Sequence, residues 1–153
     1  MLGHPMLMPV PDVARTDLML ILGGNPVVSN GSMMTAPGFG KRMDEIKARG
    51  GRVVVIDPRR TETAARAGEH LFIQPETDAF VLLALIHEVF AQGLEKLGVL
   101  AEITDGVETL REAVRPFSAD KAAEMTGIEA QTIRALARDF ATAKSAVCYA
   151  RMG

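Results

Sequence analysis

The chain has 153 residues, enough for one domain that buries about two-thirds of the surface of its unfolded chain. Hydrophobic residues make up 48% and charged residues 24%, a composition typical of a globular protein that excludes a disordered one. The net charge of −2 provides no basic surface of the kind that binds nucleic acid. A single cysteine excludes an internal disulfide and a thiolate metal cluster built by this chain alone.

An uncharged stretch, residues 18–40, resembles a membrane span at first sight. Glycines and prolines interrupt it, and its apolar run is far shorter than the roughly 20 residues that a membrane-spanning helix needs. The first five residues lack the charged start and continuous apolar core of a signal peptide. We therefore expect no membrane span and a cytoplasmic location.

The first predicted element is a buried strand over Leu18–Leu22, five apolar residues without alternation. Gly23 and Gly24 follow it directly and allow the backbone to bend and approach a ligand closely. Asn25 tolerates left-handed geometry, and Pro26 stiffens the exit of the turn. In open α/β sheets, ligands bind beyond the carboxyl ends of the strands, so we expect the binding site here.

The remaining elements follow in order after a lead-in over residues 1–16. A long loop, Val27–Ala36, contains Met33 and Met34, which favour packing on a partner. We then expect a helix over 37–49 with Phe39, Met43 and Ile46 on its buried face, a strand over 53–56, a helical turn over 62–66, a strand over 71–73, a buried helix over 78–92, shorter helices over 97–103, 107–114 and 119–125, a helix over 129–141 and a strand over 146–150. The first strand, helix and strand form a βαβ unit.

Asp57 ends the second predicted strand, where dinucleotide-binding folds place an acid that binds a ribose. An Asx-Pro turn that only ends the strand explains Asp57 equally well. Arg59 and Arg60 can hold phosphate through bidentate contacts, or they can be solvated surface charges.

Asp78 begins the helix that follows Thr77. Helix capping is a sufficient reason for Asp or Thr at these positions. The functional alternative is a carboxylate that accepts hydrogen bonds from the two N–H donors of a guanine edge, and both roles are compatible on different oxygens.

Other kinds of site receive little support. The chain has no G-x-G-x-x-G motif, so a standard nicotinamide site is not indicated. Cys148 lies in an apolar strand and is predicted to be an inert core residue. The three histidines are too dispersed for a metal site, and no catalytic residue or metal ligand is assigned.

Four segments in this order resemble the molybdopterin oxidoreductases of the dimethyl sulfoxide reductase family, which includes formate dehydrogenases and nitrate reductases. They are Gly23-Gly24-Asn25-Pro26 after the first strand, the run from Val55 to Ala64 (VIDPRRTETA), the run from Gln74 to Ala79 (QPETDA), and Thr126-Gly127-Ile128 followed by Ile133–Ala137. The resemblance covers residues 17–153. It implies a single Rossmann-like α/β domain over residues 1–153, a three-layer α/β/α arrangement with a mostly parallel sheet in the strand order 3-2-1-4.

The resemblance also implies a role for this domain: it holds the guanosine and pyrophosphate part of a molybdopterin guanine dinucleotide (bis-MGD) that carries molybdenum. Residues implicated in cofactor binding are Gly23, Gly24, Asn25, Ser29, Asp57, Arg59, Thr61, Thr77 and Asp78. The metal ligand and an iron–sulfur cluster would lie elsewhere in a longer parent chain, so the isolated chain is expected to be inactive.

Expected partners are the remaining domains of that enzyme and an electron-transfer subunit, and the isolated domain is expected to self-associate. Two other functions stay open from the residues alone. One is the nucleotide-binding middle domain of a thiamine-diphosphate enzyme, which also runs strand, glycine turn, helix, strand and Asp. The other is a non-catalytic interaction module.

Overall fold

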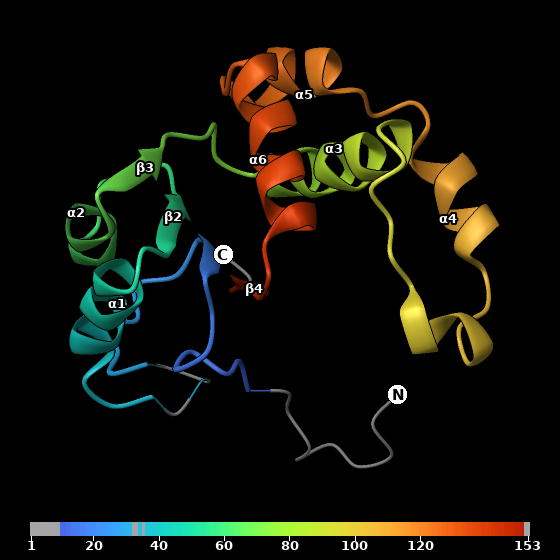
Figure 1. Cartoon of the computed structure of the whole chain (residues 1–153). Helices are drawn as coiled ribbons and strands as arrows, with labels where there is room; N and C mark the ends of the chain where they lie inside the picture. The colour runs from blue at the N-terminus through green and yellow to red at the C-terminus, as the bar shows by residue number, and fades with distance from the viewer. Residues whose placement is uncertain (1–9, 32–33, 35, 152–153) are drawn as a thin grey trace. The chain divides into compact units, whose positions relative to one another are not determined.

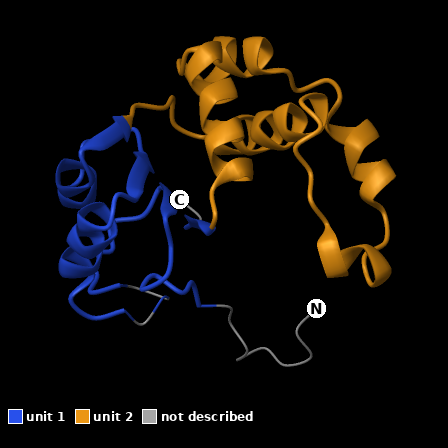
Figure 2. Cartoon of the chain, viewed as in Figure 1, with its two compact units in different colours: residues 1–70, 145–153 blue, residues 71–144 orange. Residues whose placement is uncertain are grey.

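The computed structural model describes residues 10–31, 34 and 36–151 and divides the chain into two compact units (Figure 2). Unit 1 contains Met1–His70 and Ser145–Gly153, and unit 2 contains Leu71–Lys144. In Figure 2, unit 1 carries the strands and unit 2 is helical.

Unit 1 is built on a four-stranded sheet (Figure 1). Its strands are β1 (Leu18–Leu22), β2 (Arg52–Ile56), β3 (Glu69–Leu71) and β4 (Ala146–Ala150), in the order β3-β2-β1-β4. β1 pairs in parallel with both β2 and β4, and Leu20 lies opposite Val54 on one side and Cys148 on the other. All five residues of β1 are buried, as a central parallel strand requires. The predicted α/β class and strand order are confirmed.

Two helices complete unit 1: α1 (Phe39–Ala48) and α2 (Glu62–Ala67). The predicted stripe Phe39, Met43 and Ile46 is buried on α1. It belongs to a core cluster that also contains Met19 and Ile21 of β1, Val53 and Val55 of β2, and Ala64 and Ala67 of α2. Burial of this apolar surface is the main favourable contribution to the stability of unit 1.

Two segments that were not predicted to be buried contribute to this core. Val13, within the predicted lead-in, is only 4% exposed, and the guanidinium of Arg49 donates hydrogen bonds to the carbonyl oxygens of Val13 and Thr16. Met34 is 1% exposed and packs in the core of unit 1, so the expectation that it packs on a partner is wrong. Met33, the other residue of that expectation, lies outside the described residues.

The position of β3 also differs from the prediction. The strand covers Glu69–Leu71 instead of residues 71–73, and Phe72 is 61% exposed. Polar groups account for the pairing, because the Arg52 guanidinium lies 2.8 Å from the Glu69 carboxylate and His70 Nε2 donates to the Asp57 carbonyl over 2.9 Å. Because these contacts are polar, an apolar sequence pattern does not reveal this edge strand.

Unit 2 contains five helical segments: α3 (Asp78–Ala91), η2 (Gly98–Glu102), α4 (Val107–Val114), α5 (Ala119–Thr126) and α6 (Ala130–Thr142). α3 packs against α4, α5 and α6. Ser118 caps α5 by accepting a hydrogen bond from the Lys121 N–H, and Gly127 ends α5 at φ 76°. These bounds agree with the predicted helices to within one or two residues.

The helix predicted to be buried over 78–92 is fully buried on one face only. This face consists of Val81, Ala84, Leu85 and Glu88, whereas Leu82, Leu83, Ile86, Val89 and Phe90 are half-buried. The buried carboxylate of Glu88 accepts hydrogen bonds from the Ala119 N–H and the Gln92 amide. It also lies 3.7 Å from the Arg134 guanidinium. These partners compensate the negative charge of Glu88 within unit 2.

Within the described residues, the structure has no helix long and apolar enough to cross a membrane.

Candidate functional site

The turn after β1 requires glycine at two positions for different reasons. Gly23 has φ 60°, and its N–H donates to the carbonyl of Ile56 over 3.0 Å. A Cβ on Gly24 would lie 3.2 Å from Ile21 Cγ2 and 3.3 Å from Tyr149 Cε1. Gly23 is exposed and Gly24 is buried. At Gly23 the turn therefore presents bare backbone at the carboxyl end of β1, where a ligand can approach closely.

The side chain of Asn25 forms three hydrogen bonds with other residues of unit 1. Its amide oxygen accepts hydrogen bonds from the Thr63 hydroxyl (2.7 Å) and the Thr63 N–H (3.2 Å). Its amide nitrogen donates to Glu62 Oε2 over 2.8 Å. Asn25 therefore ties the turn after β1 to the start of α2. This arrangement leaves the Asn25 side chain a supporting role in any binding site at the turn.

The loop that follows is folded back on the Asn25 carbonyl. The N–H groups of Val28 and Ser29 donate to this oxygen over 3.1 Å, and the Ser29 hydroxyl donates to it over 3.2 Å. The Gly31 N–H donates to the Pro26 carbonyl. Ser29 itself is exposed, so its hydroxyl can exchange this internal partner for a ligand.

Asp57 combines the two roles that the sequence left open. It is 7% exposed, and its Oδ1 accepts a hydrogen bond from the Arg59 N–H over 2.8 Å, which is the Asx turn. Its Oδ2 has no hydrogen bond to a described residue. Oδ2 is not among the fully buried side-chain oxygens without a partner in the described part of the chain, so it is open to a donor such as a ribose hydroxyl.

The segment after Asp57 divides into a structural and an accessible part. Thr61 is 3% exposed, and its hydroxyl caps α2 by accepting from the Ala64 N–H over 3.1 Å. Arg59 and Arg60 are exposed, and neither forms an ion pair with a described residue. These two residues follow Asp57 directly after Pro58 and offer exposed positive charge to a phosphate, and the charge of Arg59 also acts on Glu62.

The link between Asn25 and Glu62 can be tested by titration. The hydrogen bond from Asn25 holds the pKa of the Glu62 carboxyl below its ordinary value, with smaller contributions from a backbone hydrogen bond and the charge of Arg59. A lowered pKa favours the folded chain above the ordinary Glu pKa of about 4.3, and this contribution is lost as the pH falls through the pKa of the folded state.

Asn25→Ala should therefore raise the pKa of Glu62 toward its ordinary value, as followed by NMR of its side-chain carboxyl carbon. Glu95, whose pKa is lowered mainly by its hydrogen bond from Arg111, serves as an internal control and should not change. An unchanged Glu62 pKa in the variant would mean that the contact with Asn25 does not persist in solution.

Thr77 and Asp78 lie in unit 2, whereas the other seven predicted site residues lie in unit 1. The Thr77 hydroxyl donates to the Gln74 carbonyl over 2.7 Å, and Thr77 occupies the N-cap position of α3 without a capping hydrogen bond from its side chain. Asp78 is the first residue of α3 and is half-buried. Asp78 makes no capping hydrogen bond to a described residue. The structural explanation left for an acid at this position is its favourable interaction with the dipole of α3.

Cys148 was predicted to be an inert core residue, and the predicted burial is wrong. Cys148 is exposed on β4, and desolvation of the thiol raises its pKa, so that it is protonated at neutral pH. β4 lies at the edge of the sheet, where an apolar sequence does not guarantee burial. No group of three or more His, Cys, Asp or Glu within the described part of the chain is placed to hold a metal ion.

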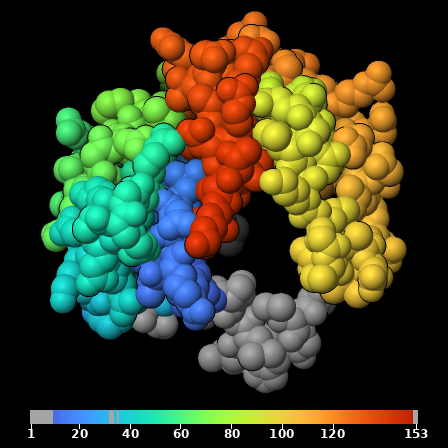
Figure 3. All heavy atoms as spheres, viewed as in Figure 1, coloured from blue at the N-terminus to red at the C-terminus, as the bar shows by residue number. Residues whose placement is uncertain are grey.

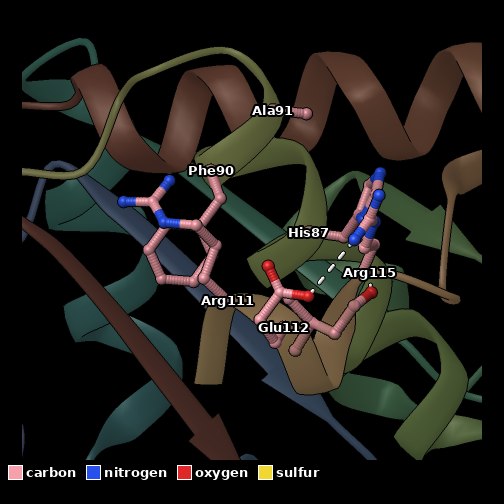
Figure 4. Close-up of a pocket in the computed structure, with 7 residues that line it drawn as sticks. His87, Phe90, Ala91, Arg111, Glu112 and Arg115 are labelled. Atoms are coloured by element: carbon pink, nitrogen blue, oxygen red, sulfur yellow. Dashed lines mark hydrogen bonds and ion pairs between the residues drawn. The ribbon is translucent and has the colours of Figure 1, made fainter. Parts of the chain in front are cut away.

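Unit 2 contains a pocket lined by α3 and α4 (Figure 4). The Arg111 guanidinium lies 4.4 Å from the centre of the Phe90 ring and pairs with the Glu95 carboxylate over 2.8 Å. His87 Nδ1 donates to the Val114 carbonyl over 3.2 Å. These groups connect α3 to α4, and none of the nine predicted site residues lines the pocket, so it is not the candidate site.

Three residues at the turn were not predicted from the sequence. Glu62 and Thr63 bind the Asn25 side chain, and the Tyr149 ring packs on Gly24. Thr63 lies within the segment VIDPRRTETA that carried part of the resemblance. The sequence contains no signal that pairs Thr63 with Asn25, because 38 residues separate them.

Comparison with known proteins identifies the context of this site. The chain is 30% identical to formate dehydrogenase H of Escherichia coli over 144 residues, which is 94% of this chain and 19% of the relative. It is 31% identical to a dimethyl sulfoxide/trimethylamine N-oxide reductase of Cereibacter sphaeroides over 142 residues, 87% of this chain and 17% of the relative. These relatives are molybdopterin oxidoreductases of the dimethyl sulfoxide reductase family, and this chain is similar to one part of them.

A solved structure supports the same similarity. Acetylene hydratase from Pelobacter acetylenicus matches with a TM-score of 0.78 and 28% identity over 92% of this chain and 19% of that one. No family model matches the chain. The chain spans about a fifth of the length of the relatives that it matches.

Proposed function

We propose that this chain binds the guanosine and pyrophosphate part of a molybdopterin guanine dinucleotide in a longer molybdenum-dependent oxidoreductase. The observation that carries the proposal is Asp57, whose Oδ2 accepts no hydrogen bond from a described residue and which follows β2, next to the Gly23-Gly24 turn at the carboxyl end of β1. A group with hydroxyl donors and a nearby phosphate is the kind of ligand that this combination binds.

The relatives support a role in cofactor binding over one in substrate recognition. Their names refer to formate, dimethyl sulfoxide and arsenate, and the solved neighbour is named for acetylene. A region that is similar across enzymes with such different substrates is better explained by a shared cofactor. This also favours the proposal over a thiamine-diphosphate enzyme or a non-catalytic module.

Within unit 1, each residue has a defined task. The backbone of Gly23 and Gly24 lets the pyrophosphate approach, Oδ2 of Asp57 accepts from the ribose, and Arg59 offers positive charge to a phosphate. The side chains of Asn25 and Thr61 hold the loop and α2 in place. Thr77 and Asp78 of unit 2 are proposed to contact the guanine, and Ser29 to contact the pyrophosphate or guanosine.

The cofactor supplies the redox chemistry at its molybdenum, and this chain contributes position and electrostatics. We assign the metal ligand, an iron–sulfur cluster and the contact with an electron-transfer subunit to other parts of the longer enzyme. The isolated chain is accordingly proposed to be inactive. A cytoplasmic location remains a prediction from the sequence.

A nucleotide titration tests the proposal. Guanosine diphosphate contains the guanosine and pyrophosphate groups of the cofactor, so adding it to the ¹⁵N-labelled chain should shift the amide signals of Gly23, Gly24 and Arg59. Asp57→Asn should weaken these shifts, whereas Asp12→Asn, at an exposed acid of unit 1, should not change them. Shifts that are absent, or that spare the turn after β1 altogether, would contradict the proposed site.

The isolated chain is also expected to self-associate. β4 forms an edge of the sheet, and Val99 and Ile103 of unit 2, in the yellow segment of Figure 3, are 84% and 78% exposed. Unpaired strand edges and exposed apolar side chains favour association. Sedimentation should show dimers or larger species at high concentration, and Val99→Glu with Ile103→Glu should reduce them. A wild-type chain that stays monomeric at every concentration would contradict this expectation.

A further inference from the structure

We propose that Thr63 is a positioning residue for the ligand-binding turn after β1. Its hydroxyl connects this turn to α2 without facing the ligand itself. The inference rests on the proposed function, because it assigns the part of unit 1 that shapes the same nucleotide site.

Thr63 is fully buried, with 0% of its surface exposed, so it cannot contact a ligand directly. It makes three hydrogen bonds to the loop that follows β1. Its hydroxyl donates to the Asn25 amide oxygen over 2.7 Å, and its N–H donates to the same oxygen over 3.2 Å. Its hydroxyl also accepts from the Val27 N–H over 3.1 Å. The donor and acceptor capacities of this hydroxyl are therefore both used on the loop.

The geometry of the loop depends on this hydroxyl. The Asn25 carbonyl organises the next turn by accepting hydrogen bonds from Val28 and Ser29, so any displacement of Asn25 also displaces them. On the other side, Asn25 directly follows the Gly23-Gly24 turn. Gly23 has a positive φ, where the backbone of a glycine is otherwise free to change. A bond from Thr63 thus restricts a turn whose own sequence permits several conformations.

Thr63→Val tests this role because valine has nearly the same shape and lacks the hydroxyl. The part-buried Val27 N–H then loses its partner, and the Asn25 amide oxygen keeps only the Thr63 N–H. Guanosine diphosphate should bind about tenfold more weakly to this variant than to the wild type, which corresponds to about 1.4 kcal/mol. Amide hydrogen exchange at Val27 and Val28 should become faster in the absence of ligand.

Two further variants separate positioning from general stability. Thr63→Ser keeps the hydroxyl and should retain most of the binding and the slow exchange. Thr126→Val removes the hydroxyl of a fully buried threonine in unit 2, where it accepts from the Ile128 N–H. It should lower the melting temperature about as much as Thr63→Val does, with unchanged exchange at Val27 and Val28.

The outcomes distinguish this inference from the proposed function. If the wild type binds guanosine diphosphate and Thr63→Val binds equally well, the positioning role is wrong and the proposed function stands. If the wild type does not bind, the proposed function is wrong, and the exchange data alone decide whether Thr63 holds the loop. Equal exchange at Val27 and Val28 in Thr63→Val and wild type would overturn the inference in either case.

Discussion

Asp78→Asn is expected to lower the guanine-dinucleotide content of the longer enzyme while leaving the melting temperature of this chain almost unchanged. A carboxylate accepts from both N–H donors of a guanine edge, whereas an Asn amide places its NH₂ against one of them. The resulting unpaired polar group costs about 1–3 kcal/mol. The affinity for the cofactor should therefore fall by about five- to a hundredfold.

The folded chain gives little reason for a change in stability. Asp78 lies at the first position of α3 and makes no capping hydrogen bond to a described residue, so the variant loses only a dipole interaction of about 0.3–1 kcal/mol. Glu108→Gln is a matched control, because it neutralises an exposed acid in the first turn of α4. Equal cofactor content in Asp78→Asn, Glu108→Gln and wild-type enzyme would remove the proposed guanine contact.

Gly31→Ala should destabilise unit 1 by about 2–5 kcal/mol. Gly31 has φ 86°, a conformation that costs an L-residue about 1–2 kcal/mol. An added Cβ would also lie 2.5 Å from the carbonyl oxygen of Ala36 and 2.6 Å from its nitrogen. Backbone atoms cannot move aside as a flexible side chain can, so overpacking adds about 1–3 kcal/mol. The midpoint of denaturant unfolding, read from amide signals of unit 1, measures the loss.

Comparison with Gly50→Ala separates the steric part of this effect from the conformational part. Gly50 has φ 85°, nearly the same backbone conformation, but its Cβ would meet nothing within 4 Å. It should cost only the conformational term of about 1–2 kcal/mol. If both variants lose the same stability, the close approach of Gly31 to Ala36 does not exist in solution.

Where one pattern dominated, the sequence was enough to predict the fold. The five apolar residues Leu18–Leu22 could only suit a strand covered on both faces, and all five are buried. Phe39, Met43 and Ile46 on α1 followed the helical period and are buried as expected. Local apolar periodicity of this kind reports on burial because each side chain follows from its own position in the element.

Features that depend on distant polar partners could not be predicted. β3 is paired through Arg52–Glu69 and His70–Asp57, contacts that no apolar pattern reveals. The connection of Asn25 to Thr63 spans 38 residues of sequence. The same reason applies to the candidate site. The sequence indicated Asn25 and Asp57 as binding residues, whereas in the fold the Asn25 side chain binds Glu62 and Thr63, and Asp57 keeps one oxygen without a hydrogen bond from a described residue.

The most direct test of the central claim is an experimental structure of the longer enzyme purified with its cofactor. We expect the guanosine ribose to lie within hydrogen-bonding distance of Asp57 Oδ2 and the pyrophosphate to lie against the Gly23-Gly24 turn. A guanine dinucleotide whose ribose and pyrophosphate are held entirely by other domains, with Asp57 Oδ2 bound to water, would contradict this claim.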